Sequence, residues 1–305
     1  MKRAAVFDIG SVSVKMIVAE GREPGGFAPL LERSRVTRLG EGLAGRHDFL
    51  PAAAGRTLEA VEEFAAEAAS LGVERMEALG TEALRRVSDP GPFARELARR
   101  TGITLEVLDH ETEARLSFLS ACSVVPDGDE PLCMLDVGGG STEILSGKNG
   151  IPGPRALLPV GALRLKEACV ETASPGEAEV SRMRGLVEDL AASHFEGMNC
   201  TRMVGMGGTV MVLASILRGE PGFDPERLHG TTLSLDGVRS VERLLCGMSP
   251  EERANVPGLP HDREDLALPG AVIVGTVMSS LDVPFLVASG WGIRHGRMRE
   301  LFETA

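Results

Sequence analysis

The 305-residue sequence has no long apolar run of the kind that membrane proteins contain. Its longest apolar stretches, such as Ala271 to Val274, are short and interrupted, whereas a membrane-spanning helix needs about 20 apolar residues. The N-terminus passes directly into a strand-like segment without the apolar core of a signal peptide. We therefore expect a soluble, cytoplasmic protein that has no association with a membrane.

Cysteine is also scarce, and no Cys-x-x-Cys spacing occurs. The five cysteines are Cys122, Cys133, Cys169, Cys200 and Cys246. Their odd number and wide scatter fit reduced thiols packed in protein cores, and argue against a disulfide framework or a zinc site. The histidines, among them His110, His229, His261 and His295, show no metal-ligand spacing, and we expect most of them to be surface or packing residues.

Positive charge is limited, because 32 Lys and Arg residues face 44 Asp and Glu residues, for a net charge of −12. A nucleic acid backbone would be repelled by such a protein unless the basic residues formed a concentrated patch. We therefore expect no DNA binding. Only four of the basic residues are Lys. Arg suits bidentate recognition of phosphate, although a bias in codon usage would give the same count.

What the sequence does contain is one motif that occurs twice. Val6-Phe-Asp8-Ile-Gly10-Ser11 opens the chain, and Met134-Leu-Asp136-Val-Gly-Gly-Gly-Ser141 follows 128 positions later (136 − 8). Each copy has an apolar run, an Asp, a Gly/Ser turn and a second strand-forming run. This pattern predicts a β-hairpin whose tip offers backbone N–H groups and hydroxyls beside a carboxylate. Two such tips that faced each other would form a phosphate-binding cleft.

Strand-like and helix-like segments alternate in both halves, which is typical of α/β layers. The length suits two domains of about 150 residues each. We place the N-terminal domain at residues 1–122 and the C-terminal domain at 123–305, and the last helix could pack back on the first domain. The boundary follows a helix capped by Asp109 and precedes a turn at 125–129. Ser174-Pro-Gly-Glu177 predicts a capping box that opens a helix reaching about Phe195.

Six motifs occur in one order along the chain: Asp8-Ile-Gly-Ser, Thr81-Glu-Ala-Leu-Arg85, Glu113-Ala-Arg-Leu, Asp136-Val-Gly-Gly-Gly-Ser-Thr-Glu143, Gly161-Ala-Leu-Arg164 and Gly207-Gly-Thr209. Through them the chain resembles the short two-domain form of the exopolyphosphatase/guanosine pentaphosphate phosphatase (Ppx/GppA) family. The resemblance implies two actin-like α/β domains of the sugar kinase, Hsp70 and actin superfamily (ribonuclease H-like), with an interdomain cleft. It also implies Mg²⁺-dependent hydrolysis of a terminal phosphoanhydride, which releases orthophosphate from polyphosphate or from the guanosine pentaphosphate pppGpp. A homodimer is consistent with the resemblance.

The resemblance also assigns roles to individual residues. Glu113 matches the catalytic glutamate, the base for the attacking water. Asp136 would orient that water or hold Mg²⁺, with Asp8 and Glu143 as further metal ligands. Arg85 and Arg164 match positions near the phosphates. These residue types suit the reaction, because phosphoanhydride hydrolysis needs charge neutralisation and an aligned, deprotonated water.

The phosphate-binding candidates are the residues of the two tips and of one later turn: Gly10, Ser11, Gly138, Gly139, Gly140, Ser141, Thr142, Gly207, Gly208 and Thr209. The last three resemble the adenosine-site turn of the superfamily. A strand-to-helix turn that needs small residues for close packing explains them equally well. For Glu113 the plainer interpretation is a first-turn residue that complements the helix dipole. Of Arg85 and Arg86, one is expected to be a solvated surface charge.

The sequence departs from the usual pattern of the family at several positions. Val12 stands where an Asn is usual, Thr112 replaces the first glutamate of a Glu-Glu pair, and Gly290 and His295 stand where acidic residues are usual. These departures keep open a non-catalytic sensor that binds polyphosphate, or guanosine penta- or tetraphosphate. An ATP-dependent kinase of the same superfamily is the other alternative.

Overall fold

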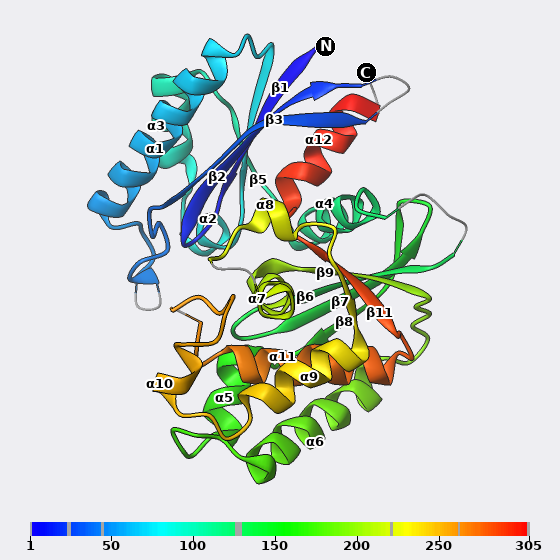
Figure 1. Cartoon of the computed structure of the whole chain (residues 1–305). Helices are drawn as coiled ribbons and strands as arrows, with labels where there is room; N and C mark the ends of the chain where they lie inside the picture. Colours follow the sequence, from blue (N-terminus) through cyan, green and yellow to red (C-terminus); the bar gives the residue numbers. More distant parts are fainter. Residues whose placement is uncertain are drawn as a thin grey trace. The chain divides into compact units, whose positions relative to one another are not determined.

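The structure is a computed structural model that describes residues 2–22, 26–43, 46–125, 130–219, 222–261 and 263–303 (Figure 1). Its contacts divide the chain into two compact units, residues 1–120 with 293–305, and residues 121–292. The division falls two residues before the boundary that we placed from the sequence, and the C-terminal helix belongs to the first unit. Most of the turn expected at 125–129 lies outside the described residues.

Unit 1 contains a five-stranded sheet in the order β3-β2-β1-β4-β5. Its elements are β1 (Arg3–Ile9), β2 (Ser13–Gly21), β3 (Phe27–Val36), α1 (Pro51–Ser70), β4 (Arg75–Gly80), α2 (Glu82–Arg86), α3 (Gly91–Thr101), β5 (Leu105–Val107), α4 (His110–Cys122) and α12 (Ile293–Glu303). Strands β1, β2 and β3 pair antiparallel, whereas β4 pairs parallel with β1 and β5 parallel with β4.

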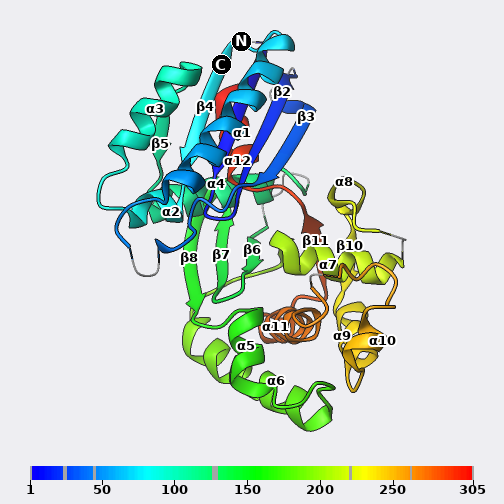
Figure 2. The ribbon, with the colours of Figure 1, turned by 90° about the vertical axis from the view of Figure 1, so that its left-hand side faces the viewer.

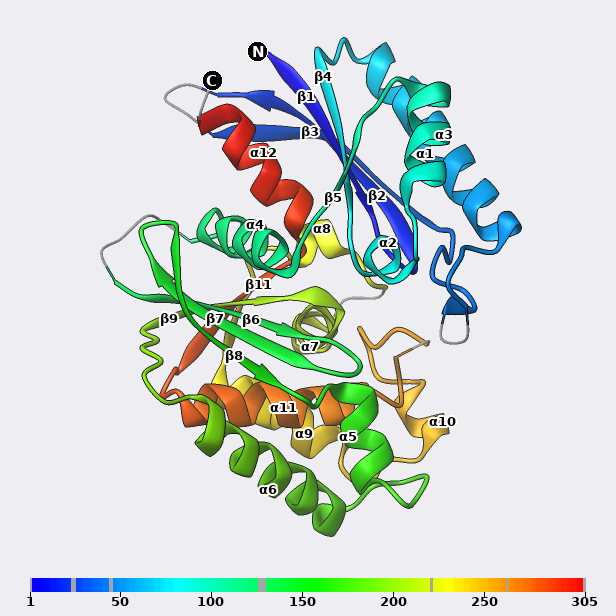
Figure 3. The ribbon, with the colours of Figure 1, turned by 180° about the vertical axis from the view of Figure 1, so that it is seen from behind.

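Side chains of β1 point alternately to the two faces of this sheet. Phe7 and its alternate neighbours pack with α1 and α3 in one buried cluster, and Val6 packs with residues of α4 and α12 in another. Figure 3 shows α1 and α3 on one side of the sheet and α12 on the other. Asp8 shares the parity of Val6 and therefore points to the face that α4 and α12 cover.

Unit 2 repeats this architecture with one added edge strand, in the order β10-β11-β9-β6-β7-β8. Its elements are β6 (Leu132–Val137), β7 (Thr142–Lys148), β8 (Ile151–Leu158), α5 (Ala162–Cys169), α6 (Glu177–His194), β9 (Arg202–Met206), α7 (Gly207–Arg218), α8 (Pro225–Leu228), β10 (Thr232–Ser234), α9 (Leu235–Leu245), α10 (Pro250–Arg253), α11 (Ala267–Ser280) and β11 (Phe285–Ser289). Strands β6, β7 and β8 form the antiparallel meander, and β9 and β11 continue it in parallel. The duplication predicted from the sequence is therefore present in the strand order.

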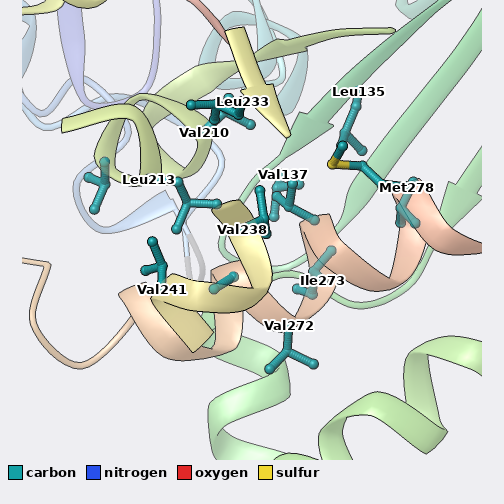
Figure 4. Close-up of a cluster of buried hydrophobic side chains, with 14 of the residues drawn as sticks. Leu135, Val137, Val210, Leu213, Leu233, Val238, Val241, Val272, Ile273 and Met278 are labelled. Carbon is teal, nitrogen blue, oxygen red and sulfur yellow. The ribbon is translucent and has the colours of Figure 1, made fainter. Parts of the chain in front are cut away.

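The core of unit 2 is built around α11, which is buried at every position from Ala267 to Met278. Figure 4 shows side chains of β6, α7, α9 and α11, including Val137, Leu213 and Ile273, meeting in this core. Figure 2 shows α11 end-on with α6 and α9 against it. Within the described ranges, no helix is both long and apolar enough to cross a membrane.

The predicted capping box at Ser174 is wrong, because α6 begins at Glu177 and a different carboxylate caps it. Glu179 accepts a hydrogen bond from the Gly176 N–H at 2.9 Å, and others from the Glu171 and Thr172 N–H groups. The side chain of Glu179 thus satisfies amides of the preceding loop as well as that of the N-cap residue, Gly176.

Candidate active site

The two Asp-Gly-Ser motifs fold into the same hairpin turn. Asp8 and Asp136 are each the penultimate residue of a central strand, β1 and β6. The Gly10 N–H donates to the Ser13 carbonyl and the Gly138 N–H to the Ser141 carbonyl, both at 3.0 Å. Our expectation that these two glycines offer amides to phosphate is therefore corrected, because each amide closes its own turn.

The amides that follow in the second turn differ from that of Gly138. Those of Gly139, Gly140 and Ser141 donate no hydrogen bond within the part of the chain that the structure describes. All three residues are exposed. Consecutive N–H groups in such a turn form an anion-binding concavity, so these three residues keep the role that the sequence predicts for them.

The N-terminus of α5 is hydrogen-bonded to this second turn. The Ala162 N–H donates to the Gly138 carbonyl at 2.9 Å, and the Leu163 and Arg164 N–H groups donate to the Gly139 carbonyl at 3.0 Å. A Cβ at Gly161 would lie 2.4 Å from the Gly138 carbonyl oxygen, so only glycine permits this approach. The exposed Arg164 guanidinium donates to the Pro159 carbonyl, and its contact with phosphate stays a prediction.

Thr142 and Glu143 have partners within unit 2. The Thr142 hydroxyl is fully buried and donates to the Val160 carbonyl at 2.7 Å, so it has a structural partner in place of the ligand that we expected. The Glu143 carboxylate lies 2.6 Å from the Arg155 guanidinium. Glu143 is the cross-strand neighbour of Asp136, but Arg155 already balances its charge.

A pocket of about 180 Å³ opens beside Asp136. It is lined by Asp136, Val137, Gly138, Gly139, Ala162, Gly208, Thr209, Val212, Arg263, Leu266 and Ala267. The pocket thus brings together three of the predicted groups: the catalytic aspartate, the Gly-rich turn and the later Gly-Gly-Thr turn.

Gly207 and Thr209 show why the later turn needs small residues. Gly207 has a φ of +81°, and a Cβ there would lie 2.5 Å from the Asp136 Oδ1 atom. The Thr209 hydroxyl donates to the Val137 carbonyl at 2.8 Å. Close packing therefore explains Gly207 and Thr209. In addition, Gly208 and Thr209 line the pocket.

Arg263 is a site residue that the sequence reasoning missed. Its guanidinium lies within 4 Å of the position that a Cβ of Gly208 would take, and it contributes to the pocket wall. No motif surrounds Arg263 in the sequence, and only the packing of the segment before α11 brings it to the pocket.

In unit 1, Glu113 lies in the first turn of α4 beside Arg85. The Asp109 side chain caps this helix by accepting from the Thr112 N–H at 2.7 Å, and that hydrogen bond holds the pKa of Asp109 below its usual range. The Arg85 Nη1 atom lies 2.6 Å from Glu113 Oε2 and 2.8 Å from the Leu108 carbonyl oxygen. The Arg85 side chain is only 16% exposed and that of Arg86 is 48% exposed, so Arg86 is the surface charge of the pair.

Asp8 belongs to the same electrostatic group as Glu113. Burial raises the pKa of Asp8, the charges of Lys15 and Arg294 oppose this rise, and the charge of Glu113 adds to it. Lys15 is the cross-strand partner of Asp8 in the β1–β2 hairpin. Lys15 was missed, although the register of the predicted hairpin was a signal that could have found it.

His295 is fully buried, so of the two roles expected for the histidines it has the packing role, and it has an acidic partner. Its Nε2 atom lies 3.2 Å from Glu32 Oε1, and the Arg294 guanidinium binds the other oxygen of Glu32. Burial opposes ionisation of Glu32, but His295 and Arg294 together lower its pKa to about 2. Glu32 of β3 is therefore the partner of His295 in α12, the position at which the family usually has an acidic residue.

Comparison with known proteins agrees with this duplicated architecture. A model of the Ppx/GppA phosphatase family matches residues 16–304. The chain belongs to the Ppx/GppA phosphatase family. Exopolyphosphatase 1 of Mycobacterium tuberculosis is 26% identical over 298 residues, which cover 96% of this chain and 86% of that relative. Exopolyphosphatase 2 of the same organism is 28% identical over 285 residues, which cover 90% and 89%.

A solved member of the Ppx/GppA family matches the fold closely. The crystal structure of the type II variant of the Aquifex aeolicus Ppx/GppA phosphatase has a TM-score of 0.88 and 29% identity, over 98% of this chain and 99% of that one. The fold class predicted from the motifs, two actin-like α/β units, is therefore confirmed.

Proposed function

We propose that this Ppx/GppA protein is a hydrolase that releases orthophosphate from the ends of inorganic polyphosphate. The observation that carries the proposal is the Glu113–Arg85 pair, because it places a carboxylate that can serve as a base 2.6 Å from a guanidinium that can bind phosphate. The Gly139-to-Ser141 turn and the pocket beside Asp136 supply the second set of groups, in unit 2. Relatives that match over most of this chain carry the name exopolyphosphatase.

The reaction can be written with these residues in named roles. A water oxygen attacks the terminal phosphorus, and its proton passes to the Glu113 carboxylate. The bond between that phosphorus and the bridging oxygen breaks, and the shortened chain leaves with the bridging oxygen. Arg85 holds Glu113 in place, and its buried Nε atom, which has no hydrogen-bond partner among the described residues, is a donor left for a phosphate oxygen. General base catalysis of this kind contributes about 10² to 10⁴ in rate.

Mg²⁺ is part of the proposal, and the donors suit it. Mg²⁺ is usually held by one or two carboxylates together with water and substrate phosphates. Asp136 at the pocket and Asp8 at the end of β1 are carboxylates of this kind. Across the described residues, no group of three or more His, Cys, Asp or Glu side chains is placed to bind an ion. When bound, Mg²⁺ would supply neutralisation of phosphate charge.

The volume of the pocket favours polyphosphate over pppGpp, and the net charge of the chain favours short polyphosphate over long. The pocket of about 180 Å³ is smaller than the roughly 300–1,000 Å³ usual for sites that hold a whole organic ligand. It suits phosphate groups better than a guanosine with its phosphates. A net charge of −12 leaves little basic surface to guide a long anionic polymer.

The test is orthophosphate release by the wild-type protein with Mg²⁺, from short polyphosphate, long polyphosphate and pppGpp. We expect the highest kcat/KM with short polyphosphate. A higher value with pppGpp would identify pppGpp as the preferred substrate, and a higher value with long polyphosphate would refute the preference for short chains. Tight binding of these ligands without release would indicate the sensor. ATP consumption that depends on an acceptor molecule would indicate the kinase.

A further inference from the structure

A second cavity of unit 2 lies between α6 and α9, and three guanidinium groups line it. Its volume is about 410 Å³, and its lining residues are Glu177, Val180, Arg184, Arg239, Glu242, Arg243 and Cys246. The lining residues of the Asp136 pocket are all different. This cavity is therefore separate from the site to which the proposed function is assigned.

The spacing of the lining residues explains how two helices build the cavity. Arg239, Glu242 and Arg243 lie on one face of α9, and the C-cap residue Cys246 continues their spacing of three and four residues. Glu177, Val180 and Arg184 follow the same rule on α6.

Glu242 organises two of the guanidinium groups. Its side chain is only 5% exposed, with one carboxylate oxygen bound by Arg184 and the other 3.1 Å from Arg239. A buried carboxylate needs compensation by positive charge, and each of these arginines is thereby held at the wall of the cavity. The Arg239 guanidinium is also close to Gly275 of α11, with its Nε atom 3.4 Å from where a Cβ would lie.

The cavity has guanidinium donors that its carboxylates do not engage. Three arginines face the carboxylates of Glu177 and Glu242. Arg243 is exposed and forms no ion pair or hydrogen bond with the described residues. The Nε atom of Arg184 is buried without a hydrogen-bond partner in the same part of the chain. Arg243 and the Nε atom of Arg184 therefore leave hydrogen-bond donors for a ligand at this cavity.

We propose that this cavity, here named the α6–α9 site, binds a compact phosphate-bearing anion. Guanidinium groups present paired N–H donors that match phosphate oxygens. Arg243 supplies a guanidinium that forms no ion pair with the described residues, and Arg184 and Arg239 supply donors that Glu242 has already oriented. The volume of about 410 Å³ admits an anion of two or three phosphate groups.

Cys246 makes the site testable, because its thiol lines the cavity. Burial and the neighbouring glutamates raise the pKa of Cys246, so alkylation is slow and needs alkaline pH. The experiment measures the alkylation rate of Cys246 in the full chain by peptide mass spectrometry, with and without inorganic pyrophosphate. Cys122, which is half-buried and outside the cavity, reports any general slowing in the same sample.

Pyrophosphate should protect Cys246 and leave Cys122 unchanged. Arg243→Gln should raise the half-protecting concentration about tenfold or more, because it removes one charged hydrogen-bonding group. Arg182→Gln is the matched control, since Arg182 is on α6 but outside the cavity, and it should leave protection unchanged. Citrate in place of pyrophosphate shows whether any polyanion suffices; protection by citrate at equal concentration would contradict the phosphate assignment. Absent protection, equal protection of Cys122, or equal protection in Arg243→Gln would overturn the proposal.

Discussion

Replacing Gly207 by alanine should disable the site through a single displaced carboxylate. Gly207 has a φ of +81°, so any Cβ costs about 1–2 kcal/mol in backbone strain. The same Cβ would lie 2.5 Å from Asp136 Oδ1, where real contacts require at least 3.0 Å and ordinary ones 3.4 Å. The carboxylate must therefore move by about 0.5–0.9 Å, and a displacement of about 1 Å at a catalytic group can cost about 10²-fold in rate.

Gly219 provides the matched control at the other end of the same helix. Its φ is +61°, and a Cβ there would meet no atom within 4 Å. Urea unfolding should show that Gly207→Ala and Gly219→Ala both lose about 1–2 kcal/mol of stability. Only Gly207→Ala should lose orthophosphate release by about 10-fold to 10²-fold. Full activity in Gly207→Ala, or an equal loss of activity in both variants, would refute the role given to Asp136.

Three further predictions concern charge. The pKa of Glu32 is about 2 instead of its ordinary 4.5, so its contribution to stability should be present above about pH 4.5 and lost as pH falls towards 2. Glu32→Gln should therefore reduce the dependence of the unfolding free energy on pH in that window. An unchanged midpoint of acid unfolding would contradict the Glu32–His295 pairing. Lys15→Met removes a charge that lowers the pKa of Asp8, so the acid limb of the rate–pH profile should move to higher pH. A shift to lower pH would disprove an ionised Asp8 in the reaction. Removing divalent ions with EDTA should abolish orthophosphate release and added Mg²⁺ should restore it, whereas full activity in EDTA would eliminate the metal.

Much of the fold could be predicted because its signals are local. The turn after Asp8 and the turn after Asp136 each join two runs of strand-forming residues, and both became hairpins with the same hydrogen bond. The pairing of Arg85 with Glu113 joins two motifs that the sequence already singled out.

The parts that could not be predicted depend on packing between distant segments. Helix α11 is buried on all sides, so its sequence has no polar face and therefore no helical periodicity to detect. Arg263 reaches the pocket only through the packing of the loop before α11. Glu32 and His295 are 263 positions apart, and only the return of α12 to the first sheet joins them. The amides of Gly10 and Gly138 looked available because turn hydrogen bonds are not visible in residue types.

The most direct test of the central claim is orthophosphate release from short polyphosphate by Glu113→Gln, compared with wild type at equal folded protein. The substitution keeps the shape of the side chain but removes the base, so the rate should fall by about 10²-fold or more. The Glu113 side chain is 31% exposed, so losing its partly solvated ion pair should cost at most about 1 kcal/mol of stability. A collapse in rate with a nearly unchanged urea midpoint would establish Glu113 as the base. A rate within a few fold of wild type would contradict the account.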